Sequence, residues 1–469
     1  MPFMTVTSDE VNYLVYRYML ESGFVHSAFS FGHESHIAKS KIGGGDVPAG
    51  ALVSYLQKGL QHTEIECHIN EDGTETLCDA AFSLLTRHQC SVRSKVKLFD
   101  PDVPIDEDFG VLETSRDAIC HYRGHTDVVF TCAFNPEGTL LVSGCQDGTA
   151  RLWLNVDDPS ASSTSSLALL DRTPSANAIL LSAWSPDGSM FALAAVSGEG
   201  WIWTAKGSLV SALSGHTGPV SGLRWAPSSA LLLTCSLDES INVWTASTGK
   251  LHSTYKTHAG AVLDCDWHPS GASFLSCSVD TTIALHETRN GSGGHPTARL
   301  FKGHTRDVNC VRWSPDATLF ASCSDDTTVK IWDPNADDPV HDLHGHGRDV
   351  CTLAWATTTT TTHDGTRALI LASASFDCTV RIWSAARGTC LLVLSKHLHP
   401  VTSVSFTSGG EHLAASSHDR VFVWSVGDGA LVRTYKATGG VNCLSWHASG
   451  ERLAVACANN SLITLRVRS

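Results

Sequence analysis

Apolar and polar residues alternate along most of the chain, in short runs that are separated by turn residues. The segment LFASCSDDTTVKIW, residues 319–332, is typical. A period of two residues is that of a β-strand with one buried face, and the polar break between two such runs indicates a turn. The pattern predicts short β-strands, rather than helices, from about residue 112 to the end of the chain.

Four landmark residues recur in this region: a His, an aromatic residue nine positions later, an Asp thirteen after that, and a Trp six further on. The complete sets are His125, Phe134, Asp147 and Trp153; His216, Trp225, Asp238 and Trp244; and His304, Trp313, Asp326 and Trp332. A period of about 40 to 45 residues, with Gly-His near its start and Trp near its end, is the mark of a WD-repeat blade. We count eight such units over residues 112–469 and predict an all-β, eight-bladed WD-repeat β-propeller.

The other units depart from the pattern. The sixth keeps His346, Asp377 and Trp383 but has nine extra residues before its Asp, and the seventh is one residue shorter before its Trp. In the fourth unit His286 replaces the Trp, and the second and eighth lose most landmarks. The carboxyl-terminal segment supplies only three strands of the eighth unit, so we expect Ala118–Tyr122 to be the missing outer strand that closes the ring.

Most units also carry a Ser or Thr four residues before the Asp, which completes a set of Ser, His and Asp that resembles a nucleophilic triad. A triad is needed once, whereas this set recurs in unit after unit. We therefore interpret it as a buried hydrogen-bond network and assign no catalytic residue, metal ligand or cofactor, and no enzymatic activity. The hydroxyl positions are Ser143, Thr234, Ser276, Ser322 and Ser373. The structural landmarks are His125, Asp147, Trp153, His216, Asp238, Trp244, His304, Asp326, Trp332, His346, Asp377 and Trp383.

Residues beside the landmarks are candidates for partner binding. In a propeller the loop with the His and the turn with the Asp open on one face, around the central channel. The predicted partner-binding residues are Asp127, Gln146, Arg306, Asp325, Arg348, Asp349, Phe376, His418 and Tyr435. Charges of both signs around an aromatic anchor suit the recognition of a peptide.

The first 110 residues follow a helical pattern. Residues 7–10, Thr-Ser-Asp-Glu, form a capping box, and apolar residues follow it at helical spacing until Gly23. Phe24, Ala28 and Phe31 can line a second short helix, and a further helix is expected after Pro48. Two short helices bury too little surface alone, so we expect self-association, with docking on the propeller as the alternative. The predicted oligomerisation residues are Leu14, Tyr18, Phe24, Ala28 and Phe31.

Charge and cysteine content narrow the choice of partners. A formal net charge of −14 disfavours sequence-independent binding to nucleic acid or to an anionic membrane, and we expect neither as a partner. The acidic excess is concentrated at the front, where residues 100–108 form the linker DPDVPIDED.

The chain contains sixteen cysteines, which include no CxxC pair and often occupy strand positions. We therefore expect packing thiols in a reducing compartment.

Residues 8–35, SDEVNYLVYRYMLESGFVHSAFSFGHES, resemble a LisH dimerisation motif. Together with INEDG at 69–73, VHDLHGH and LASASFDCTVRIW, they are similar to the transducin β-like family, the F-box-like WD-repeat proteins of nuclear corepressor complexes. The resemblance implies a LisH motif at 5–37, an F-box-like helical region at 43–90, an acidic linker at 91–111 and the propeller at 112–469.

The same resemblance implies a function. A protein of this kind is expected to be a nuclear, non-enzymatic scaffold that binds a corepressor protein, a class I histone deacetylase and histone tails. It is also expected to self-associate through the LisH region as a dimer or tetramer. The alternative is a substrate receptor or adaptor of a ubiquitin ligase, with the front domain docking the ligase and the propeller capturing clients.

Overall fold

The computed structural model describes residues 8–21, 52, 114, 118–154, 156, 166–170, 177–288, 298–356, 360–361 and 367–467. The chain divides into two compact units, Met1–Pro104 and Ile105–Ser469, and this division lies within the predicted acidic linker. The linker and, except for Leu52, the F-box-like region at 43–90 lie outside the described residues, as do Phe24, Ala28 and Phe31.

The first unit contains one described helix, α1 (Ser8–Glu21), which begins within the predicted capping box. Its side chains from Tyr13 to Met19 are half-buried, except for Tyr18, which is exposed. No helix among the described residues is long and apolar enough to cross a membrane.

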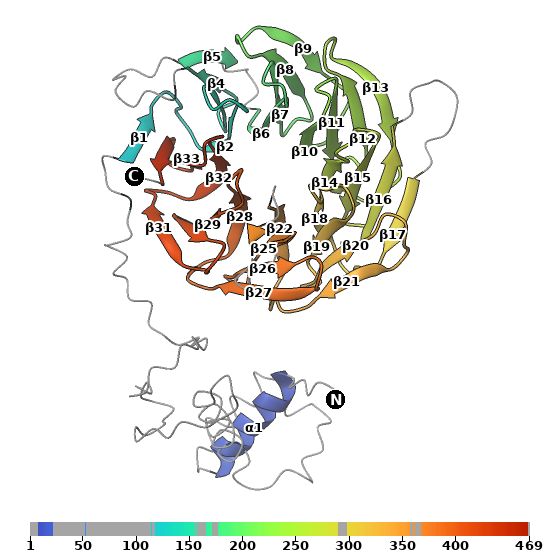
Figure 1. The fold of residues 1–469 in the computed structure, drawn as a ribbon, viewed down its shortest axis with the longest axis vertical. Helices are drawn as coiled ribbons and strands as arrows, with labels where there is room; N and C mark the ends of the chain where they lie inside the picture. Colours follow the sequence, from blue (N-terminus) through green and yellow to red (C-terminus); the bar gives the residue numbers. More distant parts are fainter. Residues whose placement is uncertain are drawn as a thin grey trace. The chain divides into compact units, whose positions relative to one another are not determined.

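The second unit is a ring of eight four-stranded antiparallel sheets, the blades (Figure 1). We number the blades along the chain and give their strands from the channel outward. Blade 1 contains β2 (Val129–Phe134), β3 (Leu141–Cys145), β4 (Ala150–Trp153) and β5 (Ser166–Leu170). Blade 2 contains β6 (Ile179–Trp184), β7 (Met190–Ala195), β8 (Gly200–Thr204) and β9 (Leu209–Leu213). Blade 3 contains β10 (Val220–Trp225), β11 (Leu231–Ser236), β12 (Ile241–Thr245) and β13 (Lys250–Tyr255).

Blade 4 contains β14 (Val262–Trp267), β15 (Ser273–Ser278), β16 (Thr282–Glu287) and β17 (Ala298–Lys302). Blade 5 contains β18 (Val308–Trp313), β19 (Phe320–Ser324), β20 (Val329–Trp332) and β21 (Pro339–Leu343). Blade 6 contains β22 (Val350–Trp355), β25 (Ile370–Ser375), β26 (Val380–Ser384) and β27 (Thr389–Leu394). The insertion predicted in this blade contributes a two-stranded ribbon, β23 (Thr360–Thr361) and β24 (Arg367–Ala368).

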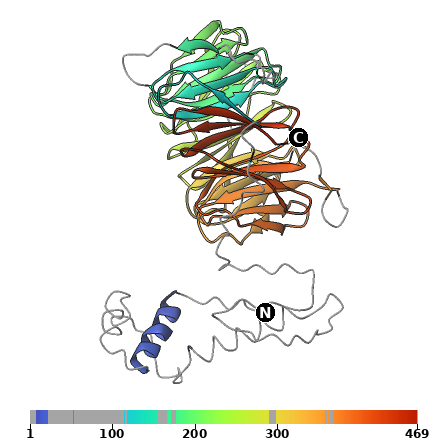
Figure 2. The same ribbon diagram turned by 90° about the vertical axis from the view of Figure 1, so that its left-hand side faces the viewer.

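Blade 7 contains β28 (Val401–Phe406), β29 (His412–Ser417), β30 (Arg420–Ser425) and β31 (Leu431–Lys436). Blade 8 contains β32 (Val441–Trp446), β33 (Arg452–Cys457), β34 (Leu462–Arg466) and, from the other end of the propeller, β1 (Ile119–Tyr122). In the edge-on view of Figure 2 the strands run across the thickness of the ring, so each blade has turns at two opposite faces.

Ring closure agrees with the sequence prediction. Strand β1 pairs antiparallel with β34, with Tyr122 opposite Leu462 and Ile119 opposite Leu465. The expectation that Ala118–Tyr122 supplies the outer strand of the last blade is therefore confirmed. Just before it, Thr114 donates its backbone N–H to the carbonyl of Thr434 on β31 at 2.9 Å, which ties the incoming chain to blade 7.

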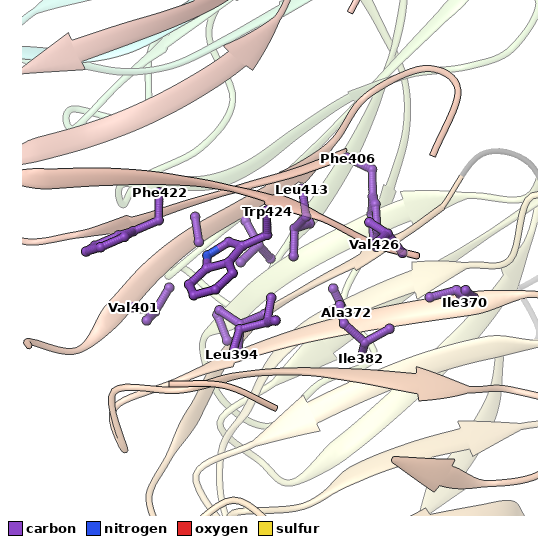
Figure 3. Packing of buried hydrophobic residues seen from close by; sticks show 14 of the residues in the cluster. Ile370, Ala372, Ile382, Leu394, Val401, Phe406, Leu413, Phe422, Trp424 and Val426 are labelled. Atoms are coloured by element: carbon purple, nitrogen blue, oxygen red, sulfur yellow. The ribbon is translucent and has the colours of Figure 1, made fainter. Parts of the chain in front are cut away.

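The core of the ring lies between neighbouring blades. Figure 3 shows one such layer, in which Ile382 and Leu394 of blade 6 pack against Val401, Phe406 and Trp424 of blade 7. Each strand alternates so that apolar side chains of one blade meet those of the next, and this burial supplies the hydrophobic stabilisation that a single blade lacks.

In five blades the Trp at the end of the inner strand donates a hydrogen bond to the blade before it. Trp184 donates its indole N–H to the carbonyl of Ala133 at 2.9 Å, and Trp225 donates to Ala183 at 3.0 Å. The same bond joins Trp267 to Arg224, Trp355 to Arg312 and Trp446 to Ser405. Phe134 has no donor for this bond, and Trp313 at the same position in blade 5 has a buried Nε1 without a hydrogen-bond partner.

A chain that starts at Gly124, without β1, is expected to aggregate or unfold, because the unpaired edge of β34 would be exposed. The control chain starts at Ile105 and keeps both β1 and Thr114. Light scattering and thermal unfolding should find only the longer chain monodisperse and cooperative. A stable, monodisperse chain from Gly124 would contradict the role of β1.

Candidate partner-binding face of the propeller

The landmark side chains meet at a buried hydroxyl in the middle of a blade. In blade 5, Ser322 Oγ lies 2.7 Å from His304 Nε2 and accepts a hydrogen bond from Trp332 Nε1 at 2.9 Å. The other ring nitrogen of His304 lies 2.8 Å from Asp326 Oδ2. Blade 6 repeats these contacts within 2.8 Å, through His346, Ser373, Trp383 and Asp377. The spacing in the sequence thus brings four distant side chains into one network.

Blades 3 and 4 form the network with substitutions. In blade 3 the hydroxyl of Thr234 contacts His216 Nε2 at 2.8 Å and Trp244 Nε1 at 2.9 Å. In blade 4 His286 stands where the Trp would be, and its Nε2 lies 3.0 Å from Ser276 Oγ. Imidazole therefore substitutes for indole as the second partner of the hydroxyl.

Blade 7 has the His and the Trp without the hydroxyl between them. Ala415 occupies that position, and Trp424 Nε1 and both ring nitrogens of His397 lack a hydrogen-bond partner of good geometry. Burial lowers the pKa of His397 to about 4, although the carbonyl groups of Leu394 and Cys378 favour its protonated form. The ring is therefore neutral near pH 7.

The network carboxylates are held in their charged form. Burial alone would raise the pKa of Asp326, but hydrogen bonds from His304 and Thr328 lower it well below its usual range. The pKa of Asp238 likewise falls to about 2, because hydrogen bonds from Ser240 and Thr217 outweigh burial. A carboxyl group whose pKa is lower in the folded state stabilises the fold above about pH 4, and this contribution is lost as the pH falls through the folded-state pKa.

The network groups are unsuited to nucleophilic catalysis. Ser322 and Ser373 are fully buried, and each Oγ already contacts a His and a Trp. A nucleophile must reach its substrate while its base accepts the proton. These hydroxyls are therefore suited to holding two strands and a loop together.

One network also brings together possible metal ligands. Among the described residues, the donor atoms of His125, Cys145 and Asp147 lie within 4.8 Å of one another. Asp147 already accepts hydrogen bonds from the backbone and hydroxyl of Thr149, and the Cys145 thiol donates to the carbonyl of Asp127 at 3.2 Å. These bonds account for the cluster without a metal ion.

Backbone bonds place the His loop and the Asp turn of a blade on the same face. In blades 1 and 6, for example, the residue before the Asp donates its N–H to a carbonyl of the His loop: Gln146 to Val128 at 2.8 Å, and Phe376 to Asp349 at 3.0 Å. Gln146, Arg306, Arg348, Phe376 and His418 are exposed, whereas Asp127, Asp325 and Asp349 are half-buried. Eight of the nine predicted partner-binding residues thus lie in these loops and turns.

Blades 5 and 6 contribute a charged sector. Arg306 donates to the carbonyl of Asp325 at 3.0 Å and lies 3.5 Å from Asp349 Oδ1 in the next blade. Asn309 on β18 donates to Asp325 Oδ1 at 2.6 Å and to the carbonyl of Val350 at 2.9 Å. Sequence reasoning missed Asn309, which lies five residues after the landmark His304, on the inner strand rather than in a loop.

Blades 2 to 4 contribute an apolar sector that sequence reasoning also missed. Val196 and Leu237 occupy the turn position of Gln146 and Phe376, and they are 41% and 43% exposed. Val279 holds the same position in blade 4 and is half-buried. The signal was available, because each of these residues directly precedes the position of the landmark Asp. The face therefore has an apolar sector beside a charged one.

Two predicted partner-binding residues have different surroundings. His418 lies against His399, with ring centroids 4.9 Å apart, on the blade 7 part of the face. Tyr435 lies on the outer strand β31, opposite Val421, and packs against the core of blades 7 and 8. Burial raises the pKa of Tyr435 to about 12. Tyr435 is therefore a packing residue away from the channel.

Comparison with protein families matches both units of the chain. The LisH family matches residues 9–35, inside the predicted motif. The family described as WD domain, G-beta repeat matches residues 116–153, 207–245, 249–287, 295–333, 337–384, 388–425 and 429–463. The unmatched stretch from 154 to 206 contains β6, β7 and β8 of blade 2, the blade that lost its His and Asp landmarks.

Individual proteins match over almost the full length. The chain is 36% identical to the F-box-like/WD repeat-containing protein TBL1X of Mus musculus, covering 99% of this chain and 100% of the relative. It is also 36% identical to the F-box-like/WD repeat-containing protein TBL1Y of Homo sapiens, covering 98% and 100%. Among solved structures, the C-terminal WD40 domain of Sif2 superimposes with a TM-score of 0.64 at 19% identity, over 75% of this chain and 99% of that domain.

Restoring the missing hydroxyl in blade 7 is expected to stabilise the propeller. Ala415→Ser places an oxygen between His397 and Trp424, which is expected to add about 1 kcal/mol and raise the melting temperature by roughly 2 °C. The matched change Ser373→Ala removes the hydroxyl of blade 6 and should cost about 1 to 3 kcal/mol. Calorimetry of both full-length variants tests the pair. Destabilisation by Ala415→Ser would contradict the proposed role of this position.

Proposed function

Because the chain belongs to the family of F-box-like/WD repeat-containing proteins, we propose that it is a non-enzymatic scaffold subunit of a nuclear corepressor complex. In this proposal the propeller face binds peptide segments of a corepressor protein and of histone tails. The complex includes a class I histone deacetylase, and the LisH region joins copies of the chain. The protein thereby regulates transcription without catalysing a reaction itself.

The division of the propeller face is the observation that carries this proposal. The network residues behind the face are buried and repeat from blade to blade, whereas their neighbours at the surface differ in each blade. An extended peptide that crosses the channel could place apolar side chains near Val196 and Leu237 and a carboxylate near Arg348. Phe376, which is 39% exposed, would give such a peptide an aromatic contact.

Helix α1 supports the self-association part of the proposal. Leu14, Val15 and Tyr18 lie toward one side of the helix by their spacing. Within the chain, Leu14 and Val15 are only half-buried and Tyr18 is 41% exposed. A second copy of the helix would cover these side chains, since its apolar side is identical.

The ubiquitin ligase alternative differs in what the front of the chain binds. Relatives named F-box-like motivate this alternative, but the corresponding region at 43–90 lies outside the described residues apart from Leu52. Both functions use the exposed face of the propeller, so the composition of the native complex is what distinguishes them. For the scaffold, purified native complexes should contain corepressor and deacetylase rather than cullin components.

The full-length double variant Phe376→Ala, Arg348→Ala is expected to recover at least about tenfold less deacetylase activity from nuclear extract than the unchanged chain, because both changes remove central contacts. The control, Leu251→Ala with Lys250→Ala, alters an exposed apolar residue and a cation on outer strand β13. Both variants should melt at the unchanged temperature. Full recovery by the face variant, or an equal loss in the control, would contradict this use of the face.

Leu14→Asp in the full chain is expected to dissociate the oligomer, because it buries a charge where two apolar helices meet. Multi-angle light scattering should then give a mass near 50.2 kDa, against a multiple of it for the unchanged chain. Leu251→Asp introduces the same charge at an exposed propeller site and should leave the mass unchanged. A monomeric unchanged chain would refute self-association.

A further inference from the structure

The boundary between blades 8 and 1, here called the seam, joins the two ends of the propeller. Besides the pairing of β1 with β34, the inner strands β2 and β32 contact each other across it. Phe134 donates its N–H to Ser445 Oγ at 3.1 Å, and Asn442 Nδ2 donates to the carbonyl of Val129 at 2.9 Å. These contacts are all noncovalent, so the seam is where the ring can open without breaking the chain.

Two cysteines face each other at the seam. The Cys443 thiol lies 3.5 Å from the carbonyl oxygen of Cys132, and the Cys132 thiol lies 3.9 Å from the carbonyl oxygen of Cys443. Cys443 is the third residue of β32, and Cys132 is the fourth residue of β2.

The boundary between blades 1 and 2 shows how side chains at these strand positions are oriented. There the third residue of β2, Thr131, meets the fourth residue of β6, Ser182, and their Oγ atoms are 2.8 Å apart. Equivalent positions on neighbouring inner strands therefore direct their side chains at one another. By the same register, Cys443 Sγ and Cys132 Sγ lie across from each other.

We propose that Cys132 and Cys443 form a reversible disulfide that closes the seam covalently when the protein meets a hydroperoxide. The Cys443 thiolate attacks one peroxide oxygen and becomes a sulfenic acid, while the O–O bond breaks and releases hydroxide. The Cys132 sulfur then attacks the sulfenic sulfur and displaces its hydroxyl group. With the two thiol protons counted, one hydrogen peroxide is reduced to two waters as two thiols become one disulfide.

The two thiols differ in a way that suits these roles. A hydrogen bond from Cys132 lowers the pKa of Cys443 to about 7, which favours the thiolate form of this residue. The same hydrogen bond, with burial, raises the pKa of Cys132 well above its usual value. Cys443 is therefore the attacking residue, and Cys132 brings the proton that leaves with water.

Other cysteines provide competitors and a reference. Cys457 lies in the core next to the seam, and burial raises its pKa to about 11, which disfavours its thiolate. Cys390 on β27 is exposed, so its oxidation reports that the peroxide dose was sufficient. A bond between residues 132 and 443 would enclose most of the ring and constrain the unfolded chain.

The test treats reduced full-length protein with hydrogen peroxide, then maps its peptides without reduction and records thermal unfolding. We expect a linked pair of peptides that contain Cys132 and Cys443, and a melting temperature higher by about 5 °C that dithiothreitol reverses. Cys443→Thr, which places the residue of Thr131 at the equivalent position, should abolish both effects. Cys390→Ser should keep them.

Three results would overturn the proposal. The first is no link between residues 132 and 443 at a dose that oxidises Cys390. The second is a link that joins either residue to Cys457 instead. The third is a reversible rise in melting temperature that persists in Cys443→Thr. If Cys443→Thr fails to fold, Cys132→Val replaces it, since Val311 and Val404 hold the matching position in blades 5 and 7.

Discussion

Each blade of this propeller has two apolar faces that only its neighbours can cover, and every other feature depends on that constraint. Seven boundaries form between blades that follow one another along the chain, but the eighth requires blade 8 to meet blade 1. Strand β1 satisfies the requirement, because it takes the outer place in blade 8 while the next strand begins blade 1. The cores between blades, the indole bonds and the ring of loops all presuppose this closure.

Within a blade, the hydrogen-bond network separates stability from recognition. The hydroxyl of Ser322 or Ser373 holds a His from one loop and a Trp from a strand, and the His in turn meets the Asp of the neighbouring turn. The residue just before that Asp binds the His loop through its backbone N–H, a contact that any side chain allows, so its side chain can differ from blade to blade. This is why Leu237, Asp325 and Phe376 hold the same position with different chemistry.

The repeat made the fold predictable from sequence, because the constraints on a blade appear in almost every unit. The spacing seen in His304 and Asp326, together with the Trp residues that remain in blades 2 and 8, allowed the blades to be counted. The shortage of strands at the carboxyl end located β1. The landmark positions also indicated which residues surround the channel, although Val196 and Leu237 were missed when charged and aromatic neighbours were chosen. The roles of Asn309 and Tyr435 were harder to predict, because each depends on a contact with a neighbouring blade. Asn309 binds Val350, a residue more than 40 positions later, and Tyr435 packs against the core between blades 7 and 8.

Closure by the two ends of the propeller also constrains how the protein is made. Tyr122 and Leu462 are 340 residues apart, so β1 leaves the ribosome long before its partner strand exists. At about 5 to 20 residues per second, that interval is roughly 20 to 70 s. Throughout this time β1 and the open side of blade 1 have no native neighbour. The first strand of the propeller is thus among the last to reach its final place.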